Sequence, residues 1–78
     1  MNLNAVISRR VKTERVARGW SQIELLKQSD WPLSHGMVSL LENGKGVWRV
    51  DVVEAFAKAF GLTPFELMTE VSPAAAAA

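Results

Sequence analysis

The feature that most constrains this chain is the way glycines divide it into short segments of helical periodicity. Gly19, Gly44 and Gly61 each follow a stretch in which apolar residues recur at helical spacing. Each of these glycines can adopt the left-handed conformation that often ends a helix. No stretch alternates apolar and polar residues over several positions, so the pattern predicts no strand. The chain is therefore expected to fold as a set of short helices.

Signals for helix starts agree with these stops. Residues 21–24 and residues 63–66 have the spacing of capping boxes, and the second contains a proline at its first helical position. Ser34 is a suitable N-cap, and Pro32 ends the helix before it near residues 29–30. The predicted helices span about residues 3–18, 21–29, 34–43 and 50–60, with a fifth that opens at residue 63.

Apolar spacing indicates which sides of these helices face a common core. The predicted core residues are Val6, Ile7, Val11, Ala17, Leu25, Leu26, Val50, Val53, Phe56, Ala57 and Phe60. The third predicted helix differs from the others, because its apolar residues cover more than one side. They are Met37, Val38, Leu40 and Leu41.

Composition limits the domain organisation and the chemistry. A chain of 78 residues has room for one domain, expected at residues 1–70, followed by a low-complexity, flexible tail at residues 71–78. Without cysteine, no disulfide or zinc–thiolate site can form, and His35 is the sole histidine. No nucleophile paired with a base and no phosphate-binding loop is apparent. We therefore expect no catalytic residue, metal, cofactor or small-molecule ligand, and a protein that is not an enzyme.

The expected location follows from two further patterns. The first ten residues lack the basic and then apolar segment of a secretory leader. No apolar run approaches the roughly 20 residues that a membrane span requires. A soluble, cytoplasmic protein without membrane association is the expectation.

Charge is distributed unevenly along the chain. The net charge is only +1, but residues 9–49 carry eight basic and four acidic residues, whereas residues 50–78 carry one lysine and four acidic residues. The first part is thus +4 and the second −3, which favours one surface that attracts anions. The alternative is chance patterning of a solvated surface.

Two groups of residues carry a resemblance to a known family. The first is Gly-Trp-Ser-Gln at residues 19–22 with Leu25, and the second is Leu-Glu-Asn-Gly-Lys at residues 41–45. From about residue 7 to residue 68, the chain resembles the phage repressor and Cro-type helix-turn-helix (XRE) family. The resemblance implies an all-α, compact five-helix, lambda-repressor-like domain. Its helix-turn-helix would be formed by helices two and three.

The resemblance also implies roles for individual residues. The implied phosphate-binding residues are Gln22, Asn43, Lys45, Arg49 and Arg10. The implied base-reading residues are Ser34, His35, Gly36, Met37, Ser39 and Leu40. A helix N-terminus attracts anions through its free amides, which supports the assignment of Gln22. The alternative is that Gln22 is an ordinary surface residue.

Four residues are assigned structural roles in the same way. Arg15 and Glu42 resemble an internal ion pair that ties the first helix to the end of the recognition helix. The alternative is an exposed location for either residue. Val47 and Trp48 stand in the loop that often forms the dimer contact of the family. For Trp48 an alternative is open, namely that the indole folds back onto the fourth helix and completes the core.

The chain departs from the family pattern in two respects. Residues 30–33 make the turn between helices two and three about two residues longer than usual, the usual glycine is absent, and Leu26 replaces a small residue. Trp31 is expected to pack over the enlarged gap, with projection into solvent as the alternative. The base-reading positions also lack the arginine, asparagine and glutamine side chains that pair best with base edges.

Together these patterns predict a regulator that binds double-stranded DNA. We expect a repressor that binds a pseudo-palindromic operator as a homodimer, with a recognition helix at about residues 34–43 in the major groove. Because base-reading side chains are poor, a second function is also considered. It is a protein-interaction module, for example antitoxin-like, that retains the fold and reads bases weakly.

Overall fold

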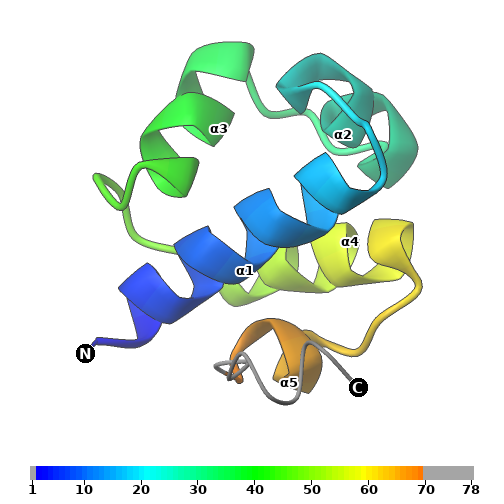
Figure 1. Ribbon diagram of the computed structural model, residues 1–78. Helices are drawn as coiled ribbons and strands as arrows, with labels where there is room; N and C mark the ends of the chain where they lie inside the picture. Colours follow the sequence, from blue (N-terminus) through cyan, green and yellow to red (C-terminus); the bar gives the residue numbers. More distant parts are fainter. Residues whose placement is uncertain (1, 70–78) are drawn as a thin grey trace.

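The computed structural model describes residues 2–69 and contains five helices in that range (Figure 1). They are α1 (Leu3–Ala17), α2 (Gln22–Ser29), α3 (His35–Glu42), α4 (Val50–Phe60) and α5 (Pro64–Leu67). These residues contain no strand, so the expectation of an all-α, five-helix domain is confirmed. The predicted tail at residues 71–78 lies outside the described residues.

The helices are arranged so that α3 has one open side. Helix α1 packs against α3, α4 and α5, while α2 packs against α3 and α4. Figure 1 shows α2 and α3 at one end of the molecule and α5 at the other. No helix among residues 2–69 is long and apolar enough to cross a membrane.

Side chains cap four helix starts, at Asn2, Ser21, Ser34 and Thr63. The capping box that begins α5 is complete, because Thr63 and Glu66 each accept a hydrogen bond from the other's amide. The box expected at α2 forms only in part. Ser21 Oγ accepts from the Glu24 amide at 3.0 Å, but the Glu24 carboxylate accepts from Gln28 Nε2 at 2.9 Å. Gln28 lies one turn further along the helix, and its hydrogen bond to the Glu24 carboxylate replaces the one that the Ser21 amide would donate in a complete box.

The long turn between α2 and α3 is closed by an aspartate and a tryptophan. Asp30 ends α2 with a φ of 52°, in the left-handed region that aspartate tolerates better than most side chains. It makes the reversal at the position where the family resemblance would lead one to expect a glycine. Trp31 is half-buried and packs against the core. The expectation that Trp31 packs inward over the longer turn, rather than projecting into solvent, is therefore confirmed.

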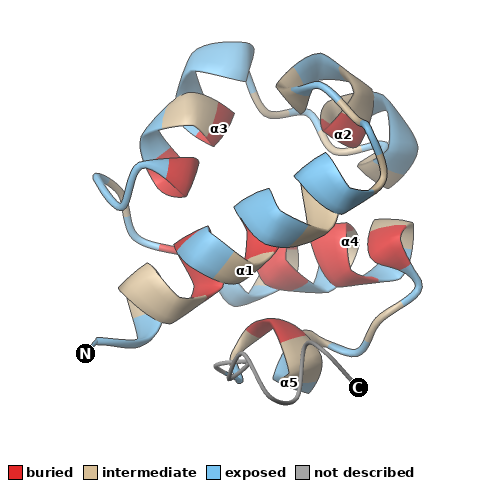
Figure 2. Ribbon diagram, viewed as in Figure 1, coloured by how far each residue is buried: buried red, intermediate tan, exposed pale blue. Residues whose placement is uncertain are grey.

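All five helices contribute buried apolar side chains to a single core (Figure 2). Its buried apolar residues are Ile7, Val11, Leu25, Val38, Leu41, Trp48, Val52, Val53, Phe56, Ala57, Phe60 and Leu67. On α4, the prediction that Val50 belongs to the core is wrong, because its side chain is exposed. Val52 is buried in its place. On α1, Ala17 is also exposed rather than buried. Both residues lie in an end turn, where the packed side of the helix is no longer covered.

A charged network ties α1 to the two C-terminal helices. The Glu14 carboxylate accepts from Arg10 Nε and Arg18 Nη1, both at 2.8 Å. Arg10 also donates to the Glu66 carbonyl at 3.0 Å, and Arg18 donates to the Phe60 carbonyl at 2.7 Å. Burial alone would raise the pKa of Glu14, but hydrogen bonds from Arg18 and Arg10 and their charges lower that pKa overall.

We expect this network to make the domain sensitive to acid. Because the pKa of Glu14 is lowered on folding, its stabilising contribution is present above the usual glutamate range and is lost as the pH falls through the folded-state pKa. In urea unfolding between about pH 6 and about pH 3, wild type should lose more free energy of unfolding than Glu14→Gln. The control Glu54→Gln removes an exposed carboxylate on α4 and should follow wild type. Identical profiles for wild type and Glu14→Gln would contradict this account.

Candidate nucleic-acid interface

Helix α3 presents one side to the core and another to solvent. Val38 and Leu41 are buried, whereas Met37 and Leu40 are 42% and 47% exposed. The structure therefore resolves why apolar residues cover more than one side of this helix: two of them pack and two do not. His35 and Gly36 are also exposed, and Ser39 is half-buried. Ser34 caps the helix, with its Oγ accepting from the Met37 amide at 3.1 Å.

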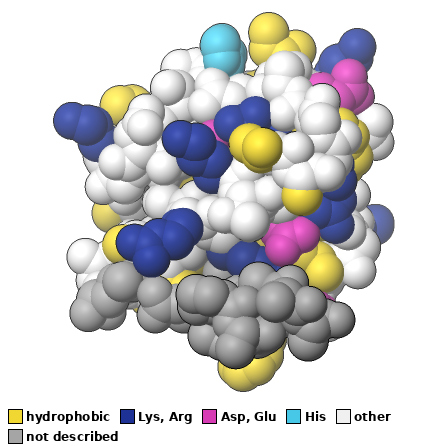
Figure 3. Space-filling model, in the orientation of Figure 1, with side chains coloured by type: hydrophobic (Ala, Val, Ile, Leu, Met, Phe, Trp, Pro, Cys, Tyr) yellow, Lys and Arg dark blue, Asp and Glu magenta, His cyan; other side chains and the backbone are white. Residues whose placement is uncertain are grey.

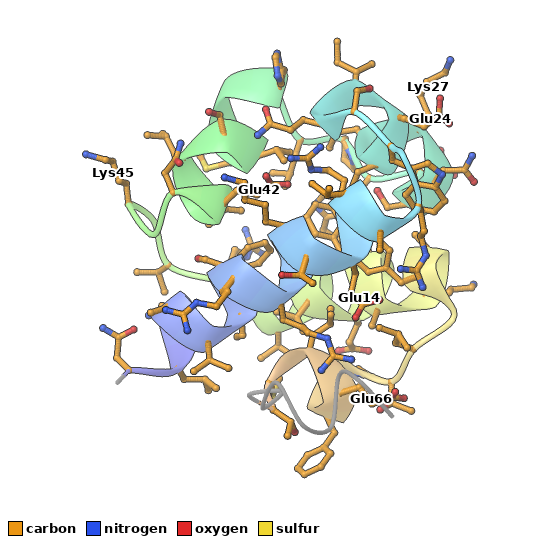
Figure 4. All side chains as sticks on the ribbon, viewed as in Figure 1. Glu14, Glu24, Lys27, Glu42, Lys45 and Glu66 are labelled. Carbon is orange, nitrogen blue, oxygen red and sulfur yellow. The ribbon has the colours of Figure 1, made fainter. Side chains whose placement is uncertain are left out.

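An ion pair holds the C-terminal end of α3 against α1. Arg15 donates to both carboxylate oxygens of Glu42, from Nε at 2.8 Å and from Nη2 at 3.0 Å. The Glu42 side chain is only 2% exposed, and Figure 4 shows it turned inward between α3 and α1. Arg15 also donates from Nη1 to the Trp20 carbonyl at 2.7 Å. These bonds fix the end of α3 relative to both α1 and the segment that leads into α2.

Gln22 connects this ion pair to the opposite end of α3. Its Nε2 donates to Glu42 Oε1 at 3.3 Å, and its Oε1 lies 2.7 Å from His35 Nε2. The side chain is thus engaged within the protein, between the two ends of α3. The phosphate contact implied for Gln22 stays a prediction. The link between Gln22 and His35 is not apparent in the sequence, because the two residues are 13 positions apart.

A second link between α1 and α3 runs through Ser8, a residue that the sequence did not single out. Buried Ser8 donates from Oγ to the carbonyl of Leu41, and it accepts from Trp48 Nε1 at 2.9 Å. The Trp48 amide donates to Asn4 Oδ1 at 2.9 Å. The available signal was the spacing of Ser8 and Val11, three positions apart on α1, which places the serine beside a core residue.

Trp48 is therefore a core residue. It is 7% exposed and packs edge-on against Phe56, with ring centroids 5.8 Å apart. Its assignment to a dimer interface is wrong, because its indole is consumed by contacts with α1 and α4. Its neighbour Val47 is 75% exposed and remains a candidate for such a contact.

The predicted phosphate-binding residues fall into two groups. Asn43 and Lys45 are exposed at or just after the end of α3, and Arg49 is exposed at the N-cap of α4. The Lys45 amide donates to the Leu40 carbonyl at 2.9 Å, which fixes where the lysine leaves the helix, and Figure 4 shows its side chain directed into solvent. Arg49 Nη2 lies 2.8 Å from Asp51 Oδ2 in an exposed pair.

Arg10 does not belong with that group. Its guanidinium is bonded to Glu14 and to the Glu66 carbonyl, at the α5 end of the molecule. The prediction that Arg10 binds phosphate gains no support from this arrangement, because the side chain is mostly covered and already paired. More generally, Figure 3 shows Lys and Arg side chains scattered over the visible face rather than gathered into one patch.

Two comparisons with known proteins both indicate similarity to helix-turn-helix transcription factors. A helix-turn-helix family model matches residues 11–67, which includes α2, α3 and the turn between them. The chain is also similar to a solved structure, a hypothetical transcription factor (NHTF) from Neisseria. The two have a TM-score of 0.79 and 30% sequence identity, and the match covers 88% of this chain and 77% of the other. No protein with a curated description matches the chain.

Proposed function

The chain belongs to the phage repressor and Cro-type helix-turn-helix (XRE) family of DNA-binding transcriptional regulators, and we propose that it is a repressor that binds a pseudo-palindromic operator as a homodimer. In this proposal α3 enters the major groove of double-stranded DNA. The exposed residues of its outer side, among them His35, Met37 and Leu40, meet the base edges. The protein would act in the cytoplasm.

One observation carries this proposal: α3 is held at its inner side while its outer side is exposed. Arg15 and Ser8 anchor its C-terminal end, and Gln22 contacts residues at both ends. A helix held in this way can enter the major groove, which is about 12 Å wide, without rearranging. The outer side offers few strong hydrogen-bonding groups. Met37 and Leu40 suit thymine methyl groups, and DNA shape would contribute the remaining selectivity.

Phosphate contacts would flank α3. Asn43 and Lys45 are exposed at its C-terminal end and Arg49 is exposed at the start of α4, while the first turn of α2 offers amides with a positive dipole end. Such contacts set the register on DNA and supply affinity without reading sequence. Val47, exposed in the α3–α4 loop, is the proposed centre of the dimer contact, and the two half-sites would lie about 34 Å apart.

We expect Lys45→Ala to weaken binding to all DNA sequences alike. Fluorescence anisotropy with a labelled random-sequence duplex should show about a three- to tenfold rise in Kd at moderate salt. The slope of log K against log salt should fall by about one, since one phosphate contact is lost. Lys58→Ala, which removes an equal charge from α4, is the matched control and should bind as wild type.

Two results would contradict the proposal. Binding that does not depend on salt, or is absent, would favour the alternative of a protein-interaction module. Equal losses for Lys45→Ala and Lys58→Ala would mean that general charge, and not a surface beside α3, drives the interaction.

A further inference from the structure

A chain of hydrogen bonds leads from the centre of the domain to the exposed start of α3. Arg15 donates to Glu42, Gln22 donates to the same carboxylate, and Gln22 Oε1 faces His35 Nε2 at 2.7 Å. The first members are covered, since Glu42 is buried and Arg15 is half-buried. The last member, His35, is exposed on the side of α3 that would face DNA.

The chemistry of each member fixes the direction of every bond. An ionised carboxylate only accepts, so Gln22 must turn its NH₂ group toward Glu42 and its carbonyl oxygen toward His35. A carbonyl oxygen also only accepts, so His35 must donate from Nε2. In the neutral imidazole, the proton on Nε2 leaves Nδ1 as a lone-pair acceptor. The buried ion pair thereby selects the tautomer of an exposed histidine.

We propose that this bond chain makes His35 a reader of exocyclic amino groups, so that it prefers adenine or cytosine at one operator position. In the major groove, adenine N6 and cytosine N4 are the hydrogen-bond donors, whereas guanine and thymine present acceptors that would face the Nδ1 lone pair. Gln22 is the positioning residue, because it acts on the base only through His35. This inference rests on the proposed function, since it names the class of base edge that α3 reads.

The test is a comparison of base preferences at one position. Operator sites are selected from a random duplex pool at about pH 8, above the range in which histidine side chains usually carry charge. The operator position read by His35 is the one at which His35→Ala removes the preference for one base over the others. Kd values are then measured for four duplexes that differ only there, with wild type, Gln22→Met and Gln28→Met. Gln28 is the matched control because it also donates to a glutamate, but within α2.

Wild type should bind the adenine or cytosine duplex about fivefold more tightly than the guanine or thymine duplex, as one hydrogen bond would give. Gln22→Met frees the imidazole to use either tautomer, so this ratio should fall below about twofold, while Gln28→Met should keep it. The ratio is measured within each variant, so a general loss of affinity or stability does not change it.

Several outcomes would overturn the inference. They are a wild-type preference for guanine or thymine, an unchanged ratio in Gln22→Met, and the absence of any position at which His35→Ala has an effect. In each of these cases salt-dependent binding would still support the proposed function. If no duplex were bound with salt dependence, both the proposed function and this inference would fail.

Discussion

Arg15→Met is expected to lower the free energy of unfolding by about 3–5 kcal/mol, because it leaves a buried carboxylate without its main partner. Glu42 is 2% exposed and receives two of its hydrogen bonds from Arg15, with only a longer one from Gln22. The Trp20 carbonyl loses its donor in the same variant. Urea denaturation followed by circular dichroism measures the loss. For a domain of this size, with a total stability of about 4–12 kcal/mol, the change is large.

A second variant separates the charge from the shape of this site. Arg15→Met combined with Glu42→Leu removes both charges together and should recover most of the lost stability. It should not recover DNA affinity, because the end of α3 is then no longer fixed by a bidentate bond. Arg49→Ala, which breaks an exposed pair, should change the stability by less than about 0.5 kcal/mol. A double variant as unstable as Arg15→Met would show that buried charge is not the cause.

The helix pattern was readable from the sequence because it depends on neighbours in the chain. Caps and stops are local chemistry: Ser34 and Thr63 bond to amides three residues ahead, and Gly61 ends α4 in the left-handed conformation. The predicted span of residues 50–60 for the fourth helix agrees with α4. Where a neighbour competes, as Gln28 does for Glu24, the same reasoning fails.

The arrangement of the site was less predictable because its bonds join distant residues. Nothing local to Ser8 indicates that its partners are Leu41 and Trp48. The same holds for Gln22, whose partners come from both ends of α3. A family resemblance implies which positions matter, but not which of them bond to one another. The partners emerge only when the helices pack.

Charge counts along the sequence overstated the basic surface. The segment of residues 9–49 carries a net charge of +4, yet three of its arginines, Arg10, Arg15 and Arg18, are committed to carboxylates within the domain. Internal pairing cancels such charges at long range. Lys45, in contrast, is exposed beside α3. The field at the proposed interface therefore depends on a few side chains, which explains why single lysine substitutions are informative there.

Trp48→Ala is expected to cost about 3–5 kcal/mol of stability, because it removes a buried aromatic side chain from the core. The substitution also leaves Ser8 Oγ without the indole donor and removes the edge-on contact with Phe56. Thermal and urea unfolding should show a domain that is barely folded at room temperature. Its loss of DNA binding would follow from unfolding, and excess DNA should partly restore the folded state.

Val47→Asp is the matched variant, one residue away and 75% exposed. It should leave the stability of the monomer within about 0.5 kcal/mol of wild type, because no buried contact is lost. On DNA with two half-sites it should lose cooperative binding, since two like charges would meet at the proposed dimer contact, while binding to a single half-site should persist. If Val47→Asp bound both duplexes as wild type, the dimer contact would have to lie elsewhere. If Trp48→Ala left the stability unchanged, the indole would not be part of the core, and the anchoring of α3 through Ser8 would need another explanation.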